Sequence, residues 1–350
     1  MSFRIYRKTH MKHPTFYSSG KLLLTGEYVV LDGALALAVP TKFGQSLVVE
    51  EIETSQIIWK SFDEKKQVWF EEVFHFENNE ISRQARKDSN IESQVSIESE
   101  VSNRLIEILR AAQELNPEFL KDQKGYQITT LLEFPKNWGL GTSSTLINNI
   151  ATWANVDAYQ LLEKTFGGSG YDIACAQHEL AITYQLHNSE ISRQARKDNS
   201  PLQNDSQVQE DRRTVNEVQF NPAFKEHLYF VHLNKKQNSR DGIAQYKKNN
   251  ANIEIAISEI DQITKDIIAC KTLDTFDLLM EKHEQIISEI IHLKPVKEVL
   301  FKDFNGSIKS LGAWGGDFVL VSSKTNPTDY FRHKGFDTIL KFDEMASSIY

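Results

Sequence analysis

The stretch Phe134–Ile150, FPKNWGLGTSSTLINNI, carries the strongest signal in this sequence. A Gly-Leu-Gly turn leads to three hydroxyl residues, Thr142, Ser143 and Ser144, and then to an apolar pattern of helical period. The start of a helix leaves about four backbone N–H groups unpaired and carries a partial positive charge. Glycines let that backbone approach an anion closely, and the hydroxyls can cap the helix, bind phosphate or hold a bridging magnesium ion.

The ordinary alternative is a structural N-cap, in which Gly139 and Gly141 form a tight turn and one serine caps the helix. Taken alone, this explanation is the simpler one, because serine and threonine caps are common. The stretch is not a Walker A loop, since Gly-Lys-Ser/Thr is missing, and it is not a dinucleotide-binding fingerprint, since the third glycine is missing.

The patterns on either side predict a mixed fold. Residues 125–134 alternate like a strand, so the local order is strand, glycine turn, helix. Upstream, residues 34–52 indicate strand, turn and strand, residues 56–76 a hairpin, and residues 101–115 a helix. Downstream, we expect strands at 227–233 and 338–342, amphipathic helices at 251–270 and 276–293, and a buried strand after the glycines of 311–318. Strands and helices without strict alternation predict an α+β protein in two lobes.

Composition excludes several classes of protein. The chain has 350 residues, a net charge of −8 and a pI of about 5.7, which argues against a general nucleic-acid binder. An anionic small molecule is compatible only with a local basic pocket. Two cysteines are too few for a disulfide scaffold and favour a reducing cytoplasm. The basic N-terminus has no apolar core of a secretion signal, and no run approaches the ~20 apolar residues of a membrane span.

Two polar segments interrupt the pattern. Residues 77–100 and 187–215 hold few apolar side chains, and both contain the nonapeptide EISRQARKD, at Glu80–Asp88 and Glu190–Asp198. We interpret them as solvated insertions of low structural content, with a duplicated docking peptide as the alternative. The predicted organisation is a disordered tail at 1–13, an N-terminal lobe at 14–186 containing the first insertion, the second insertion, and a C-terminal lobe at 216–350.

Three further pieces strengthen the phosphate interpretation. The segment SSGKLLLTGEYVVLDG contains Lys21 and Glu27, FGGSGYDIACA places Asp172 behind three glycines, and LGAWGGDF is a second glycine loop before a strand. Each piece alone is weak, because an aspartate after glycines is most often a helix cap. Together and in this order they are specific.

With these motifs the chain resembles the GHMP kinases, the family of galactokinase, homoserine kinase, mevalonate kinase and phosphomevalonate kinase. GKLLLTGEYVVLDG is similar to the family's first motif, PKNWGLGTSST to its Pro-x(3)-Gly-Leu-Gly-Ser-Ser-Ala loop, and LGAWGGDFVLV to its C-terminal glycine motif. The likeness covers about residues 14–185 and 220–345. The GYDIA string resembles a bacterial subgroup of mevalonate-pathway members.

The resemblance implies an N-terminal lobe like domain 2 of ribosomal protein S5, a ferredoxin-like C-terminal lobe, and ATP bound between them. It implies that Gly139, Gly141, Thr142, Ser143 and Ser144 hold the ATP phosphates and that Ser143 also holds magnesium. The catalytic aspartate would be Asp172, with Lys21 beside it. Glu27 and Tyr28 match positions near the acceptor, and Gly312, Gly315 and Gly316 match the loop that shapes the cleft.

These residue types suit phosphoryl transfer, which needs positioning and charge neutralisation more than covalent help. Asp172 would accept or orient the acceptor hydroxyl proton. An ammonium within a few Å lowers a carboxylate pKa by ~1–3 units, so Lys21 would keep Asp172 ionised. Thr142-Ser143-Ser144-Thr145 departs from the commoner Ser-Ser-Ala-Ala. Trp138 and Trp314 flank the two loops, where we expect them to pack.

The acceptor stays open between mevalonate and phosphomevalonate. Lys235, Lys236 and Arg240 could serve a more anionic acceptor, although a solvated basic loop is the ordinary alternative. Two functions of other kinds are also kept: an inactive binding or regulatory protein of this fold, and a decarboxylase relative. Retention of both Asp172 and Lys21 argues against the inactive protein. We expect no nucleic-acid or membrane partner, and a homodimer is left open.

Overall fold

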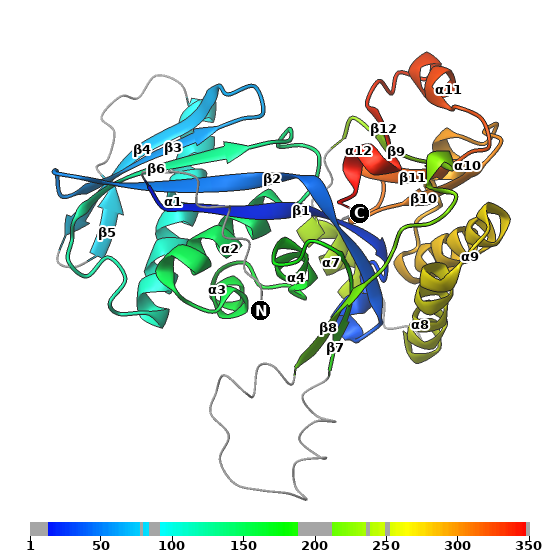
Figure 1. Ribbon diagram of the computed structural model, residues 1–350, viewed down its shortest axis with the longest axis horizontal. Helices are drawn as coiled ribbons and strands as arrows, with labels where there is room; N and C mark the ends of the chain where they lie inside the picture. Colours follow the sequence, from blue (N-terminus) through cyan, green and yellow to red (C-terminus); the bar gives the residue numbers. More distant parts are fainter. Residues whose placement is uncertain are drawn as a thin grey trace, which may run out of the picture. The chain divides into compact units, whose positions relative to one another are not determined.

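The computed structural model describes residues 13–77, 80–83, 92–187, 212–235, 239–248 and 253–347 (Figure 1). The chain forms two compact units that are each discontinuous in sequence. Unit 1 comprises Met1–Gly20, Phe43–Lys136 and Gly141–Gln177, and unit 2 comprises Lys21–Lys42, Asn137–Leu140 and His178–Tyr350. Within the described residues, no helix combines the length and the apolar character that crossing a membrane requires.

Unit 1 is a sheet covered on one face by helices, as Figure 1 shows. The sheet follows the order β5-β4-β3-β6-β2, and its only parallel pair among these strands is β3 with β6. The core consists of apolar side chains from the inner face of the sheet and from the helices, including Trp59, Phe74, Leu109 and Ile147, all nearly unexposed. The elements are β1 Thr15–Thr25 (its first part), β2 Ala36–Ile52 (its second part), β3 Gln56–Phe62, β4 Val68–Glu77, β5 Glu80–Arg83, α1 Glu92–Leu115, β6 Gly125–Leu132, α2 Thr142–Ala154, α3 Ala158–Thr165 and α4 Tyr171–Ala176.

Unit 2 contains a four-stranded antiparallel sheet of order β10-β11-β9-β12. With its helices the order along the chain is β-α-β-β-α-β, the ferredoxin-like arrangement expected for the C-terminal lobe. The helices α8 and α9 pack against each other beside this sheet. The elements are η1 Val29–Asp32, β7 Ala181–Leu186, β8 Arg213–Val218, η2 Lys225–His227, β9 Leu228–His232, α7 Ser239–Lys248, α8 Ile253–Ala269, α9 Leu273–Ile291, α10 Val296–Leu300, β10 Ser307–Ser310, β11 Phe318–Ser322, α11 Thr328–His333, β12 Ile339–Lys341 and α12 Phe342–Met345.

Most predicted elements are confirmed, but the expected turn within residues 34–52 is wrong. The segment is one continuous strand, β2, despite Pro40 and Gly44. Residues 36–38 pair with β7 and residues 45–52 pair with β6. Pro40 lies between these two ladders, where neither needs the N–H that proline lacks. Gly44 is required by close approach, since a Cβ there would lie 2.4 Å from the carbonyl oxygen of Ser18.

The first polar segment has more structure than its composition suggests. Glu80–Arg83, the start of the first EISRQARKD copy, forms the edge strand β5 against β4, and Ile81 is fully buried. The helix α1 begins at Glu92, inside the predicted insertion. The rest of this copy, the whole second copy and residues 1–12 of the predicted tail lie outside the described residues.

Candidate active site

The helix α2 begins without a side-chain cap. Its N-cap position is Gly141, which has a left-handed φ of 93° and carries no side chain to accept the first N–H groups. The ordinary N-cap explanation, in which a serine caps the helix, is therefore wrong for this helix. An uncapped helix start presents backbone N–H groups and a partial positive charge, which is the arrangement that binds anions.

The three hydroxyl residues after Gly141 have different surroundings. Ser143 is exposed, Thr142 is half-buried and Ser144 is buried. The Ser144 hydroxyl donates to the carbonyl oxygen of Gly141 at 2.9 Å, and the Thr145 hydroxyl bonds the Gln45 side-chain oxygen at 2.7 Å. Ser144 and Thr145 thus fix the glycine turn and the base of the helix, whereas Ser143 is exposed and is the most accessible of the three predicted phosphate-binding hydroxyl residues.

Asp172 lies in the first turn of the short helix α4, also in unit 1. Gly170 precedes the helix with a left-handed φ of 85°, and Gly167 and Gly168 have open space where a Cβ would be. The Asp172 carboxylate is half-buried and accepts the backbone N–H of Ile173 at 3.1 Å. The following residues of α4 are buried, so the helix holds its aspartate at a fixed point of unit 1.

Lys21 contacts the glycine turn that precedes α2. Its ammonium donates to the carbonyl oxygen of Gly139 at 3.1 Å, and its backbone N–H donates to the carbonyl of Leu140 at 2.9 Å. Leu140 is directly followed in the chain by Gly141, so Lys21 is held at the predicted phosphate loop. Lys21 belongs to unit 2 and Asp172 to unit 1, and the expected pairing of their side chains stays a prediction.

The second glycine loop lies in unit 2 and contacts the first through one carboxylate. A Cβ added to Gly139 would meet the Asp317 carboxyl group at 2.2–2.8 Å. Gly315 is exposed with open space around it, and Gly316 is buried. Asp317 was not among the predicted site residues. The signal for it was present in the sequence, as the acidic residue that closes the second glycine motif.

The two tryptophans near these loops pack, as expected. The ring of Trp138 lies edge-on to Phe318 at 5.3 Å between centroids and near the ring of His232 at 6.4 Å. Trp314 is 1% exposed. Both side chains therefore contribute packing around the loops.

Tyr28, predicted to lie near the acceptor, is buried and hydrogen-bonded, and its contact with an acceptor stays a prediction. Its hydroxyl donates to the carbonyl oxygen of Ala313 in the second glycine loop at 2.9 Å, and its ring stacks on Tyr246 at 5.6 Å between centroids. Its backbone has a φ of 62°, which is uncommon outside glycine. Tyr28 therefore ties the turn after β1 to the loop of residues 311–317, all within unit 2.

Glu27 lies in a buried cluster of charged side chains. Its carboxylate has no exposed surface and pairs with the Lys309 ammonium, which is also fully buried. Glu284 accepts from the backbone N–H of Ser310 at 3.0 Å and from its hydroxyl at 2.8 Å. This burial gives no support to direct contact between Glu27 and an acceptor. The cluster instead joins the turn at residue 27 to strand β10, which leads into the second glycine loop.

Burial sets the protonation of this cluster. Desolvation raises the pKa of Glu27 against the opposing Lys309 charge, and it raises the pKa of Glu284 to about 7. Burial and the Lys309 charge hold the pKa of His283 well below its usual range. The neutral imidazole accepts the Gly26 N–H at Nε2, at 3.0 Å. The 3.3 Å contact of Nε2 with Glu27 Oε2 is consequently not an ion pair.

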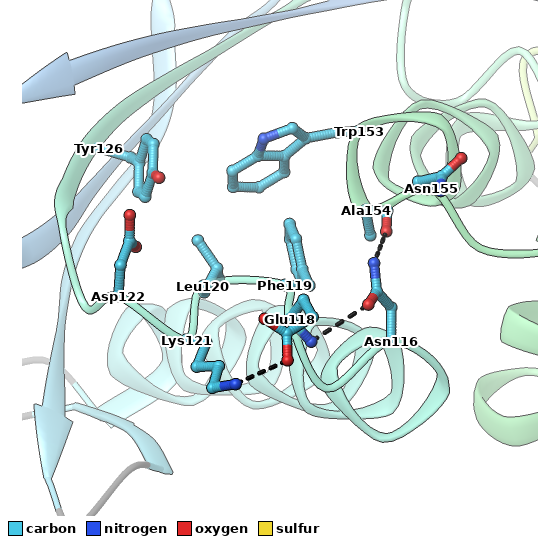
Figure 2. A pocket seen from close by; sticks show the side chains of 10 residues that line it. All are labelled: Asn116, Glu118, Phe119, Leu120, Lys121, Asp122, Tyr126, Trp153, Ala154 and Asn155. Atoms are coloured by element: carbon cyan, nitrogen blue, oxygen red, sulfur yellow. Dashed lines mark hydrogen bonds and ion pairs between the residues drawn. The ribbon is translucent and has the colours of Figure 1, made fainter.

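A cavity of about 710 Å³ lies elsewhere in unit 1 (Figure 2). Figure 2 shows the side chains of Phe119, Tyr126 and Trp153 around it, at the C-terminal end of α2. A helix of 13 residues spans about 20 Å at 1.5 Å per residue, so the cavity is far from the N-terminus of α2. None of the predicted site residues lines it.

Comparison with known proteins supports the fold. No protein-family model matches the chain, and no curated protein sequence matches it. Solved structures do match. The mevalonate kinase of Methanococcus jannaschii is 14% identical, with a TM-score of 0.63 over 98% of this chain and 100% of that one. The phosphomevalonate kinase of Streptococcus pneumoniae, in complex with phosphomevalonate and AMPPNP, is 15% identical, with a TM-score of 0.63 over 94% and 100%.

The galactokinase of Lactococcus lactis, complexed with galactose, is 14% identical, with a TM-score of 0.57 over 92% of this chain and 88% of that one. Likeness at such low identity concerns the fold, and it extends over nearly the whole chain. The predicted fold class is confirmed: the chain has the α+β fold of the GHMP kinases.

Proposed function

We propose that the protein is an ATP-dependent kinase that transfers the γ-phosphoryl group to a mevalonate-type acceptor, either mevalonate or phosphomevalonate. The observation that carries the proposal is the uncapped start of α2, where Gly141 leaves the first N–H groups open beside the exposed Ser143 hydroxyl. A triphosphate is the ligand that uses this arrangement best, because several amides and the helix charge act on it at once.

Within this proposal, residues of the chain bind the phosphates, neutralise charge and accept a proton. The amides at the start of α2 bind the phosphates, and the Lys21 ammonium, held at Gly139, neutralises charge that develops on the transferred group. With mevalonate as the acceptor, the Asp172 carboxylate receives the proton of the acceptor hydroxyl as that oxygen attacks the γ-phosphorus and ADP leaves. The glycine turns allow close approach of the backbone, since a side chain there would exclude the phosphates.

The residues present are compatible with a magnesium ion. Among the described residues, no group of three or more His, Cys, Asp or Glu side chains is arranged to hold a metal. Magnesium bound to nucleotides takes few protein ligands and completes its shell with phosphate oxygens and waters. The exposed Ser143 hydroxyl would be such a ligand. When bound, the ion neutralises the charge of the phosphates.

The acceptor class rests on similarity. A mevalonate kinase and a phosphomevalonate kinase share the fold along nearly their whole length, and the Asp172 carboxylate suits an acceptor with a free hydroxyl. Of the basic residues that would favour the more anionic acceptor, Lys235 is exposed, and the side chains of Lys236 and Arg240 lie outside the described residues. Mevalonate and phosphomevalonate therefore both remain candidates.

An ATP-coupled assay tests the proposal against mevalonate, phosphomevalonate, homoserine and galactose. We expect turnover with one of the first two, and a stable phosphorylated product: a phosphate ester from mevalonate or a diphosphate from phosphomevalonate. The variant Asp172→Asn keeps the shape of the side chain but removes the base, so turnover should fall by about 10²–10⁴-fold while ATP affinity is largely kept.

Three outcomes would favour other functions. Equal turnover in the wild type and in Asp172→Asn would remove the base assignment. Nucleotide binding without turnover of any acceptor would favour an inactive binding protein. Release of carbon dioxide in place of a stable phosphorylated product would favour a decarboxylase.

A further inference from the structure

A network of buried polar side chains lies beneath α2 in unit 1. Ser18 on β1, Asn148 and Asn149 on α2, and Gln45 on β2 are between 0% and 7% exposed. The Ser18 hydroxyl donates to Asn149 Oδ1 at 2.8 Å and accepts from Asn148 Nδ2 at 2.9 Å. Buried polar groups need partners, and apolar side chains of similar size would fill the space without this requirement. The network therefore calls for an explanation other than packing.

The direction of the hydrogen bonds along this network, from donor to acceptor, is fixed. Asn149 Nδ2 donates to the main-chain carbonyl of Gln45 at 2.9 Å, and a carbonyl can only accept. Asn149 Oδ1 must then be the acceptor for Ser18. Ser18, having given its only proton, must accept from Asn148 Nδ2. The oxygen Oδ1 of Asn148 is left facing outward, and it requires a donor.

That donor is Gln177, the residue that follows α4. Its Nε2 donates to Asn148 Oδ1 at 3.0 Å. Gln177 is itself exposed, so its amide reaches from the surface into the network. The hydrogen bond joins the helix whose start would bind phosphate to the helix that carries Asp172, and Ser18 joins both to β1, the strand that continues to Lys21.

We infer that Gln177 is a positioning residue. Through its hydrogen bond to Asn148, it holds Asp172 at a fixed position relative to the start of α2. The inference rests on the proposed function, because the position of Asp172 relative to α2 matters only if a phosphoryl group at α2 must meet an acceptor at Asp172. Misplacement of a reacting group by about 1 Å can cost about 10²-fold in rate. A residue that touches neither substrate therefore controls turnover.

The variant Gln177→Glu tests this inference, because it keeps the size of the side chain and replaces the donor with an acceptor. The rest of the network cannot reverse, so the carboxylate would oppose Asn148 Oδ1. We expect kcat to fall about 10-fold or more, with the KM for ATP within about two-fold of the wild type. Gln177→Met removes the donor without adding charge, and it should likewise lower kcat while leaving the KM for ATP nearly unchanged.

Two controls separate positioning from stability. Gln285 on α9 is an exposed glutamine whose amide donates to Glu289 at 2.8 Å, so Gln285→Glu makes the same change elsewhere and should leave kcat unchanged. Asn116 donates to the carbonyl of Ala154 at 2.7 Å, at the opposite end of α2. Asn116→Ala should lower the melting temperature without changing kcat per folded molecule.

A second readout does not depend on turnover. Hydrogen exchange of amides in 171–177 should be slowed by AMPPNP in the wild type and not in Gln177→Glu, if binding at α2 is transmitted to α4. Unchanged kcat and unchanged nucleotide protection in Gln177→Glu would overturn the inference and leave the kinase assignment intact. A wild type that neither binds AMPPNP nor turns over any acceptor would instead overturn the proposed function.

Discussion

Gly139 shows how tightly one position of the phosphate loop is specified. It has a left-handed φ of 66°, and a Cβ there would collide with the Asp317 carboxyl group. A left-handed conformation costs a non-glycine residue about 1–2 kcal/mol, and the collision adds to this cost. The backbone conformation therefore favours glycine at this position, and an added Cβ would also force the Asp317 carboxyl group to move.

We predict that Gly139→Ala lowers the free energy of unfolding by more than the left-handed conformation alone would. The matched control is Gly335→Ala, which has a φ of 87° but open space around the added Cβ. Urea unfolding of both variants measures the difference. The same loss in both would mean that the contact with Asp317 has no energetic consequence. Gly139→Ala should also raise the KM for ATP, and Gly335→Ala should not.

The hydroxyl residues show what the sequence could and could not predict at this scale. The sequence placed Thr142, Ser143 and Ser144 together at a helix start, and that placement is confirmed. It treated them alike, whereas Ser144 is buried against Gly141 and Ser143 is exposed. The difference depends on the rotation of α2 about its axis, which its packing against the sheet determines.

At the scale of elements, the buried charges on α9 and β10 predict a pH dependence. The pKa of Glu284 rises from 4.5 to about 7 through burial. The charged or titratable groups near Glu284 are Glu27, Lys309 and His283. Between pH 4.5 and 7 the folded protein keeps a proton that the unfolded chain releases, so the stabilisation present below pH 4.5 is lost as the pH rises through 7.

The variant Glu284→Gln should remove this dependence. Its oxygen can still accept from the Ser310 N–H, and it has no proton to lose. As the pH rises from 5 to 8, the variant should become more stable relative to the wild type. The change in the difference between their free energies of unfolding should be on the order of 3 kcal/mol. His283, whose pKa is lowered, acts in the opposite direction but is present in both proteins and cancels. Parallel curves for the two proteins would contradict a buried Glu284 that titrates near neutrality.

The same elements show why part of the site escaped prediction. The amphipathic pattern of α9 was recognised, and its buried face, which includes Phe276, Met280 and Ile287, also takes in His283 and Glu284. The helical period of the apolar residues in α9 therefore indicates that these two polar residues lie on the buried face. Lys309, whose charge acts on both residues and whose ammonium pairs with Glu27, lies 26 residues further along the chain from His283. Nothing local in the sequence indicates that Lys309 and α9 come together.

At the scale of the whole molecule, the order of motifs and elements was enough to predict the fold. The α+β class and the ferredoxin-like sheet follow from strand and helix patterns together with the resemblance, and the comparisons confirm the fold. The division into units was less accessible. The strands β1 and β2 each contribute to both units, and a boundary that runs through a strand leaves no composition signal such as a linker would.

The most direct test of the central claim is hydrogen exchange of the wild-type protein with AMPPNP and magnesium. We expect slower exchange of the amides in residues 139–146, because the start of α2 would donate its N–H groups to the phosphates. Residues 116–124, a segment that contributes most of the lining of the cavity in Figure 2, serve as the internal control and should not change. Protection at 116–124 with none at 139–146 would contradict the claim that α2 holds a triphosphate.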